Sequence, residues 1–142
     1  MAQPANIISQ QTIEVNANSP DGANTLYITN GFANFYLSVM APPGGGNASQ
    51  QGTFAALLGP TLTAAQFKRA IATASLAGLH HQESDPAAST GIVWSLSNVE
   101  AEFDDESGQI ELRFDVSLLV YGSGSYAFTP SVAFQVMTLA TI

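Results

Sequence analysis

The chain has 142 residues and contains no cysteine. Disulfides, thiol catalysis and cysteine-based metal sites are therefore excluded. A chain of this length can bury enough apolar surface to fold without a covalent or metal crosslink. We expect a single domain over residues 1–142.

Basic residues are almost as scarce. The chain has three, Lys68, Arg69 and Arg113, and a formal net charge of −8. Nucleic-acid binding needs a track of cations that displaces counterions from phosphates, and three scattered cations do not build one. Anionic membrane surfaces are disfavoured for the same reason. This acidic protein is predicted to bind neither.

Charged residues of both signs make up 10% of the chain, against about 25% in ordinary domains, while hydrophobic residues make up 46%. This balance favours a folded core over disorder. The surface must be covered largely by neutral polar and small side chains.

Targeting and membrane segments are also missing. The first six residues include no basic group, and no apolar run approaches the roughly 20 residues of a membrane span. We expect cytoplasmic synthesis without a Sec signal. The final location is expected to be an assembled particle, or extracellular by a non-Sec route.

Period-two alternation is the main pattern that is present, and it predicts long β-strands. In the segment 110–120, alternate residues are apolar and face inward: Ile110, Leu112, Phe114, Val116, Leu118 and Val120. The residues between them are polar as far as Ser117. Leu119 and Tyr121 then break the polar face, so we expect a partner to cover its far end.

Three irregularities interrupt the strand pattern. The alternation changes phase near Ser97-Asn98, which predicts a β-bulge. Asn30-Gly31 favours a tight hairpin, with one long strand bulged at the glycine as the alternative. Pro130 removes a backbone donor, so its strand is predicted to lie at an edge or to carry a bulge.

Residues 63–77 are predicted to form the single helix. Thr63 and Gln66 have the spacing of a capping box, and an apolar stripe at helical spacing is formed by Phe67, Ala70, Ile71 and Ala74. The remaining elements are strands. The fold class is therefore all-β: an antiparallel β-sandwich or jelly-roll-like fold with one inserted helix. Residues 42–52, rich in proline and glycine, are predicted to be a flexible loop.

Seven of the eleven acidic residues lie between Glu100 and Asp115. Asp104 and Glu106, in the turn 104–108, could offer oxygen ligands to calcium. The alternative is an ordinary hairpin turn with Gly108 in a left-handed bulge, which we favour. Arg113 is predicted to neutralise a glutamate across the neighbouring strand. No other cofactor is indicated.

His80, His81, Glu83 and Asp85 form a second candidate metal site. Adjacent histidines in extended backbone point apart, so we favour a position beyond the helix end. The plausible exposed rings are Tyr36, Trp94, Tyr121 and Tyr126, and for Trp94 we favour the alternative, a place in the core. No nucleophile elbow or phosphate-binding loop is present.

These observations predict a non-enzymatic structural or assembly protein. Its strands are long, its surface has few charges, and apolar residues interrupt a polar face. We expect a self-associating subunit of an oligomer, a filament or a virus- or phage-like particle, with Leu119 and Tyr121 at the interface. Its partners would be copies of itself or other protein subunits. The alternative is a calcium- or carbohydrate-binding β-sandwich module.

Overall fold

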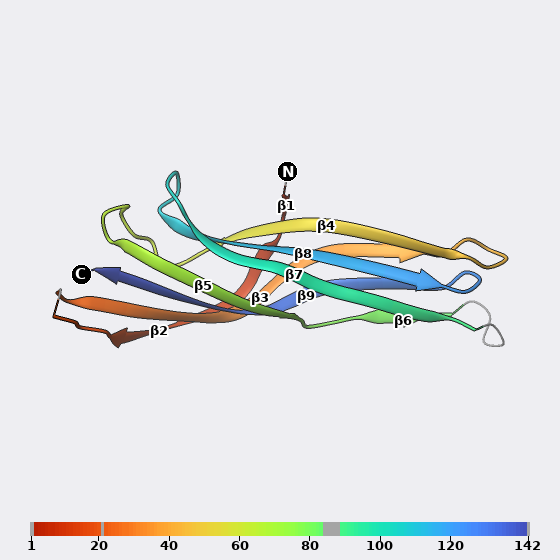
Figure 1. The fold of residues 1–142 in the computed structure, drawn as a ribbon, viewed down its shortest axis with the longest axis horizontal. Helices are drawn as coiled ribbons and strands as arrows, with labels where there is room; N and C mark the ends of the chain where they lie inside the picture. The colour runs from red at the N-terminus through yellow and green to blue at the C-terminus, as the bar shows by residue number, and fades with distance from the viewer. Residues whose placement is uncertain (1, 21, 84–88, 142) are drawn as a thin grey trace.

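The computed structural model describes residues 2–20, 22–83 and 89–141, and these form a β-sandwich with no helix (Figure 1). Its strands are β1 (Gln3–Pro4), β2 (Asn6–Asn16), β3 (Asn24–Met40), β4 (Asn47–Leu58), β5 (Phe67–Leu76), β6 (His80–Gln82), β7 (Gly91–Asp104), β8 (Gln109–Tyr121) and β9 (Tyr126–Thr141). The predicted all-β fold class and the long strands are confirmed. Strand β4 begins at Asn47, so the connection that precedes it is shorter than the loop 42–52.

Two sheets form the layers of the sandwich. Sheet A has the strand order β1-β4-β8-β7, and sheet B has the order β2-β3-β9-β5, with β6 also paired to β9. Every pair is antiparallel except β1 with β4. The strands run along the long axis of the molecule, with turns gathered at its two ends (Figure 1).

The core lies between the sheets and is built from the alternation that the sequence shows. The inward residues predicted on β8 are each 1% exposed or less. They meet buried residues of β3, β4 and β9, and the ring of Phe114 clusters with those of Phe35 on β3 and Phe54 on β4, with centroids 4.6–5.8 Å apart. Such ring pairs add stability beyond the area they bury.

The predicted helix at 63–77 is wrong, because residues Phe67–Leu76 form strand β5 against β9. The capping-box contacts do form: the Thr63 amide donates to Gln66 Oε1 at 2.9 Å, and the Gln66 amide donates to Thr63 Oγ1 at 3.3 Å. They close one turn and no helix continues from it. The spacing of the alanines in this segment fits a strand as well as it fits a helix. The pairing with β9 therefore decides the conformation.

The predicted hairpin at Asn30-Gly31 is also wrong. Strand β3 continues through Gly31, which pairs with Gln10 on one side and Phe134 on the other. A Cβ at position 31 would lie 2.1 Å from the Ser9 carbonyl oxygen and 2.9 Å from the Phe134 ring. The glycine therefore allows close strand approach instead of making a turn.

Both remaining irregularities are bulges. The β7–β8 register shifts between Ser97 and Glu100, with Asn98 at a φ of 51°, which confirms the predicted bulge. Pro130 lies in the interior of sheet B, not at an edge. The β3–β9 register shifts there, between Asn34 and Leu37, and the neighbouring strand is interrupted between β5 and β6. The missing proline donor is accommodated by these irregularities.

Candidate interaction surfaces

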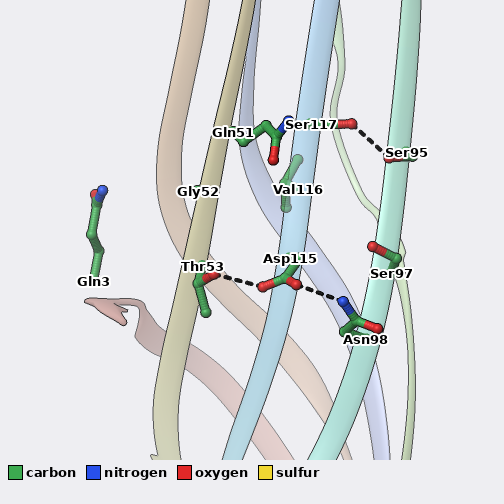
Figure 2. Close-up of a pocket in the computed structure, with 10 residues that line it drawn as sticks. All are labelled: Gln3, Gln51, Gly52, Thr53, Ser95, Ser97, Asn98, Asp115, Val116 and Ser117. Atoms are coloured by element: carbon green, nitrogen blue, oxygen red, sulfur yellow. Dashed lines mark hydrogen bonds between the residues drawn. The ribbon is translucent and has the colours of Figure 1, made fainter. Parts of the chain in front are cut away.

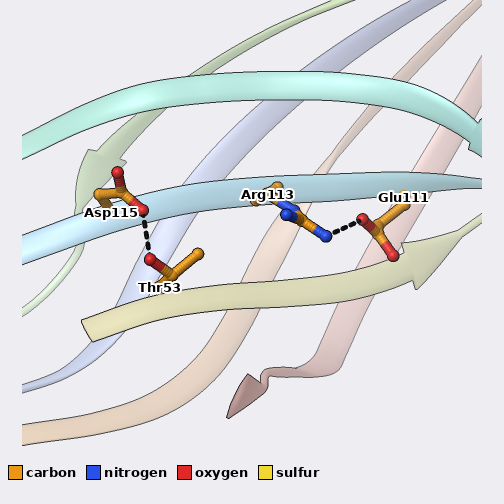
Figure 3. A network of polar contacts seen from close by, with 4 residues as sticks. All are labelled: Thr53, Glu111, Arg113 and Asp115. Carbon is orange, nitrogen blue, oxygen red and sulfur yellow. Dashed lines mark hydrogen bonds and ion pairs between the residues drawn. The ribbon is translucent and has the colours of Figure 1, made fainter. Parts of the chain in front are cut away.

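The outward face of sheet A carries the acidic residues. Glu100 lies opposite Arg113, and Glu102 lies opposite Glu111. Arg113 nevertheless pairs along its own strand, with Nη2 3.1 Å from Glu111 Oε1 (Figure 3). The predicted cross-strand ion pair is therefore replaced by one within β8. Both side chains are partly exposed, so the pair contributes little to stability.

The acidic turn is closed by its own hydrogen bonds. The Ser107 amide donates to Asp104 Oδ2 at 2.9 Å, and the Ser107 hydroxyl donates to the same oxygen at 2.5 Å. Gly108 has a φ of +72°, as the left-handed bulge requires. Within the described residues, no three acidic, histidine or cysteine side chains gather in a way that could hold a metal ion. Calcium at Asp104 and Glu106 stays a prediction.

A shallow groove of about 470 Å³ crosses the middle of this face (Figure 2). Asp115 of β8 lies at its centre and accepts hydrogen bonds from Thr53 Oγ1 of β4 and Asn98 Nδ2 of β7, both at 2.7 Å. Both hydrogen bonds hold the pKa of Asp115 below its usual range, and the one from Asn98 has the larger effect. The bulge of β7 thus brings an amide onto a carboxylate of the neighbouring strand, β8.

Neutral polar groups complete the groove. The Ser95 and Ser117 hydroxyls share a hydrogen bond of 2.6 Å, with Gln51 of β4 beside Ser117 and Gln3 of β1 at the opposite side of the groove (Figure 2). Asp115 is the one ionisable side chain among the ten residues that line the groove. The arrangement can hydrogen-bond a polar ligand. It does not supply the pair of carboxylates that glycoside hydrolysis uses.

The residues predicted at an interface lie at the other end of this face. Tyr121 is 43% exposed, and Leu119 is half-buried opposite the exposed Val93. The Tyr121 ring lies against the backbone of Gly91, where a Cβ would come within 2.1 Å of the phenol oxygen. Together Val93, Leu119 and Tyr121 form a small apolar patch.

The two histidines belong to strand β6, so the position predicted for them beyond a helix end is wrong. As expected of neighbours in a strand, they have different surroundings: the His80 ring stacks on Phe128 with centroids 4.4 Å apart, and His81 Nε2 lies 2.6 Å from Ser125 Oγ. Glu83 accepts a hydrogen bond from Thr90. Asp85 lies outside the described residues.

A second apolar surface, the outward face of sheet B, was not foreseen from the sequence. Register partners across β2, β3, β9 and β5 form four rows. The rows are Val15–Leu26–Leu139–Arg69, Ile13–Ile28–Met137–Ile71, Gln11–Asn30–Gln135–Thr73 and Ser9–Phe32–Ala133–Ser75. We call the second, which is apolar on all four strands, the apolar row.

Aromatic residues continue this face toward β6. Tyr36 and His80 both stack on Phe128, and the Tyr36 and Tyr126 hydroxyls share a hydrogen bond of 2.7 Å. That bond raises the pKa of Tyr126, and burial raises it further. The expectation for Trp94 is wrong, because it is 49% exposed on the edge strand of sheet A.

A signal for this face was present in the sequence. Strand β9 is apolar in both phases: Val132, Phe134 and Val136 face the core, while Ala133, Met137 and Leu139 face outward. A strand that is apolar in both phases is typical of a sheet covered on both sides. Ile71 was assigned to the helical stripe, which concealed its place in the apolar row.

In comparisons with known proteins, no family model, curated sequence or solved structure matches this chain. No helix in the described part of the chain has the length and hydropathy needed to cross a membrane.

Proposed function

We propose that this protein is a non-enzymatic structural subunit that self-associates through the outward face of sheet B. The observation that carries the proposal is the apolar row. It crosses all four strands, and Ile13 and Ile71 at its ends are 57% and 53% exposed. A contiguous apolar surface of this kind marks an interaction site.

A second copy is the partner that the charge distribution favours. Arg69 is the one charged side chain in the four rows of the sheet B face. Glu100, Glu102, Glu111 and Asp115 all occupy the outward face of sheet A. Two copies packed through their sheet B faces would therefore keep these acids on the outside of the dimer. A net charge of −8 would then oppose association only weakly at moderate salt.

The size of the face is sufficient for a specific contact. Four strands spaced about 4.8 Å apart, each contributing about eight residues at 3.3 Å, cover roughly 500 Å². The aromatic residues on β3, β9 and β6 extend this footprint to about 700 Å². A stable interface buries about 800 Å² per partner, so the whole face approaches the usual size.

The test is the effect of a buried charge on association. We expect Ile71→Asp to weaken self-association at least about tenfold, because a carboxylate would be desolvated within the contact. Sedimentation equilibrium of wild type and variant measures the change. Leu57→Asp is the matched control, since Leu57 is an exposed aliphatic residue (43%) on the outward face of sheet A, opposite Glu111.

A third variant separates the two apolar surfaces. Val93→Asp places the same charge in the patch formed with Leu119 and Tyr121, at a residue that is 59% exposed. If Val93→Asp dissociates the protein and Ile71→Asp does not, the interface is the sheet A patch and the sheet B face is rejected.

A binding module is the second candidate, and the groove around Asp115 is the observation that favours it. Its fixed carboxylate and neutral amides and hydroxyls suit a polyhydroxylated ligand such as an oligosaccharide. For a glycan that the wild-type protein binds on an array, Asp115→Asn should then weaken binding at least about tenfold, because a charge-assisted acceptor is lost. An array on which wild type binds no glycan would reject this candidate.

A further inference from the structure

Strand β2 has a free edge that is unlike the other edges of the two sheets. It pairs with β3 without interruption from Ser9, opposite Phe32, to Asn16, opposite Thr25. Among the described residues, no strand pairs with its other side. Both of its faces are exposed along this stretch, because sheet A does not extend over it (Figure 1).

The other edges carry features that block pairing. Strand β7 has the bulge at Asn98 and the acids Glu100 and Glu102, and β4 is partly covered by β1. Strand β5 has a register shift beside the two cations Lys68 and Arg69. Bulges, charges and short covering strands are the means by which proteins protect edges from association. From Ser9 to Asn16, β2 has one charged residue, Glu14, and no proline.

We infer that β2 pairs antiparallel with β2 of a second copy, about a two-fold axis that passes at Ile13 normal to the sheet. This inference rests on the proposed self-association and adds a second contact to it. The two copies of sheet B would form one eight-stranded sheet. Because the unpaired backbone groups of an edge strand are a ready template for another strand, β2 needs no rearrangement to pair in this way.

Side-chain pairing selects this register. With the axis at Ile13, Ile13 of each copy meets its equivalent, and the apolar row continues across eight strands. Glu14 then lies opposite Thr12 of the second copy, which avoids a like-charge pair. An axis at Glu14 would oppose two carboxylates, and an axis at Thr12 would place Ile13 against Gln11.

The two contacts differ in their consequences. A face contact and an edge contact each relate two copies by a two-fold axis, so a subunit that uses both has two different self-complementary interfaces. Repetition of two such interfaces about axes that do not meet produces an open chain of subunits. The edge contact would thereby extend the proposed dimer into a filament.

The absence of cysteine makes the register directly testable, because one introduced thiol is unique. In the predicted pair, the Cα atoms of residue 13 lie about 4.5–5.5 Å apart, within the disulfide range of about 4.4–6.8 Å. At Gln11 or Val15 the equivalent Cα atoms would be about 14 Å apart. Ile13→Cys should therefore form dimers under mild oxidation, while Gln11→Cys and Val15→Cys should not.

The experiment is carried out in the Ile71→Asp background, so that face contacts do not bring the thiols together. Leu57→Cys, on the outward face of sheet A and away from the patch at Val93, measures the background of random collisions. Equal crosslinking at positions 11, 13 and 15, or at 13 and 57, would overturn the register. No crosslink at 13, with wild type still self-associating, would reject the edge contact and leave the face contact standing.

A pair of charge variants gives a second, independent readout. With Glu14 opposite residue 12, Thr12→Lys should strengthen the edge contact and Thr12→Glu should weaken it. Gln10→Lys and Gln10→Glu control for net charge, since residue 10 would lie opposite Asn16. If the difference between lysine and glutamate is no larger at position 12 than at position 10, the proposed pairing is wrong. A wild type that stays monomeric would overturn both contacts together.

Discussion

At the scale of single residues, Asp115 shows how local hydrogen bonds set a property that the sequence could not reveal. The sequence placed it on the outward phase of its strand, next to Arg113. Its partners come from strands distant in the chain, Thr53 on β4 and Asn98 at the bulge of β7. The bulge itself was predictable from the change of phase, but the contact it creates was not.

The lowered pKa of Asp115 leads to a pH-dependent prediction. A carboxyl group whose pKa is lower in the folded state stabilises the fold above its unfolded pKa, and this stabilisation is lost as the pH falls through the folded value. We expect the melting temperature of wild type to exceed that of Asp115→Asn near neutral pH. The difference should shrink below about pH 4, where the carboxyl group takes up its proton.

Melting curves of the two proteins between neutral pH and about pH 2 measure this difference. Ser97→Ala, another groove residue, serves as a control without a titrating group. A gap between wild type and Asp115→Asn that is the same at every pH would show that the hydrogen bonds to Asp115 do not favour its ionised form.

At the scale of elements, the sequence predicted most strands and misassigned two segments for the same reason. The short-range signal at Thr63 and Gln66 was read correctly, because the capping contacts exist. The turn predicted at Asn30-Gly31 does not form, because β3 continues through it. The conformation of the chain after each signal depends on strands far away in the sequence. Strand β9 pairs with β5 and with β3, so one distant strand decides both segments. Local propensity could not contain that information.

Gly31 provides a test of this explanation. If Gly31 is needed because β2 and the Phe134 ring approach its backbone closely, Gly31→Ala should lower the free energy of unfolding by about 1–3 kcal/mol. The added methyl group would meet backbone atoms of β2 that must then shift. Urea denaturation measures the loss. Gly59→Ala is the control, because a Cβ there meets nothing within 4 Å. An effect at Gly31 no larger than at Gly59 would contradict the close-approach role.

At the scale of the whole molecule, the two sheets have opposite surfaces. Sheet A turns acids and a polar groove outward, and sheet B turns outward the apolar row and stacked rings. Composition already indicated a surface with few charges and a tendency to associate. The sequence pattern placed the interface at Leu119 and Tyr121, because the alternation of apolar and polar residues was clearest in their strand and these two residues interrupt it. Locating the apolar row on sheet B required the registers of four strands.

The central claim is that the chain self-associates, and sedimentation equilibrium of the wild-type protein in moderate salt tests it most directly. We predict a concentration-dependent rise from the mass of one chain, 14.8 kDa, to that of a dimer or larger assembly, and a shift of this rise to higher concentration in Ile71→Asp. A wild-type protein that sediments as a single chain up to high micromolar concentration would contradict the claim.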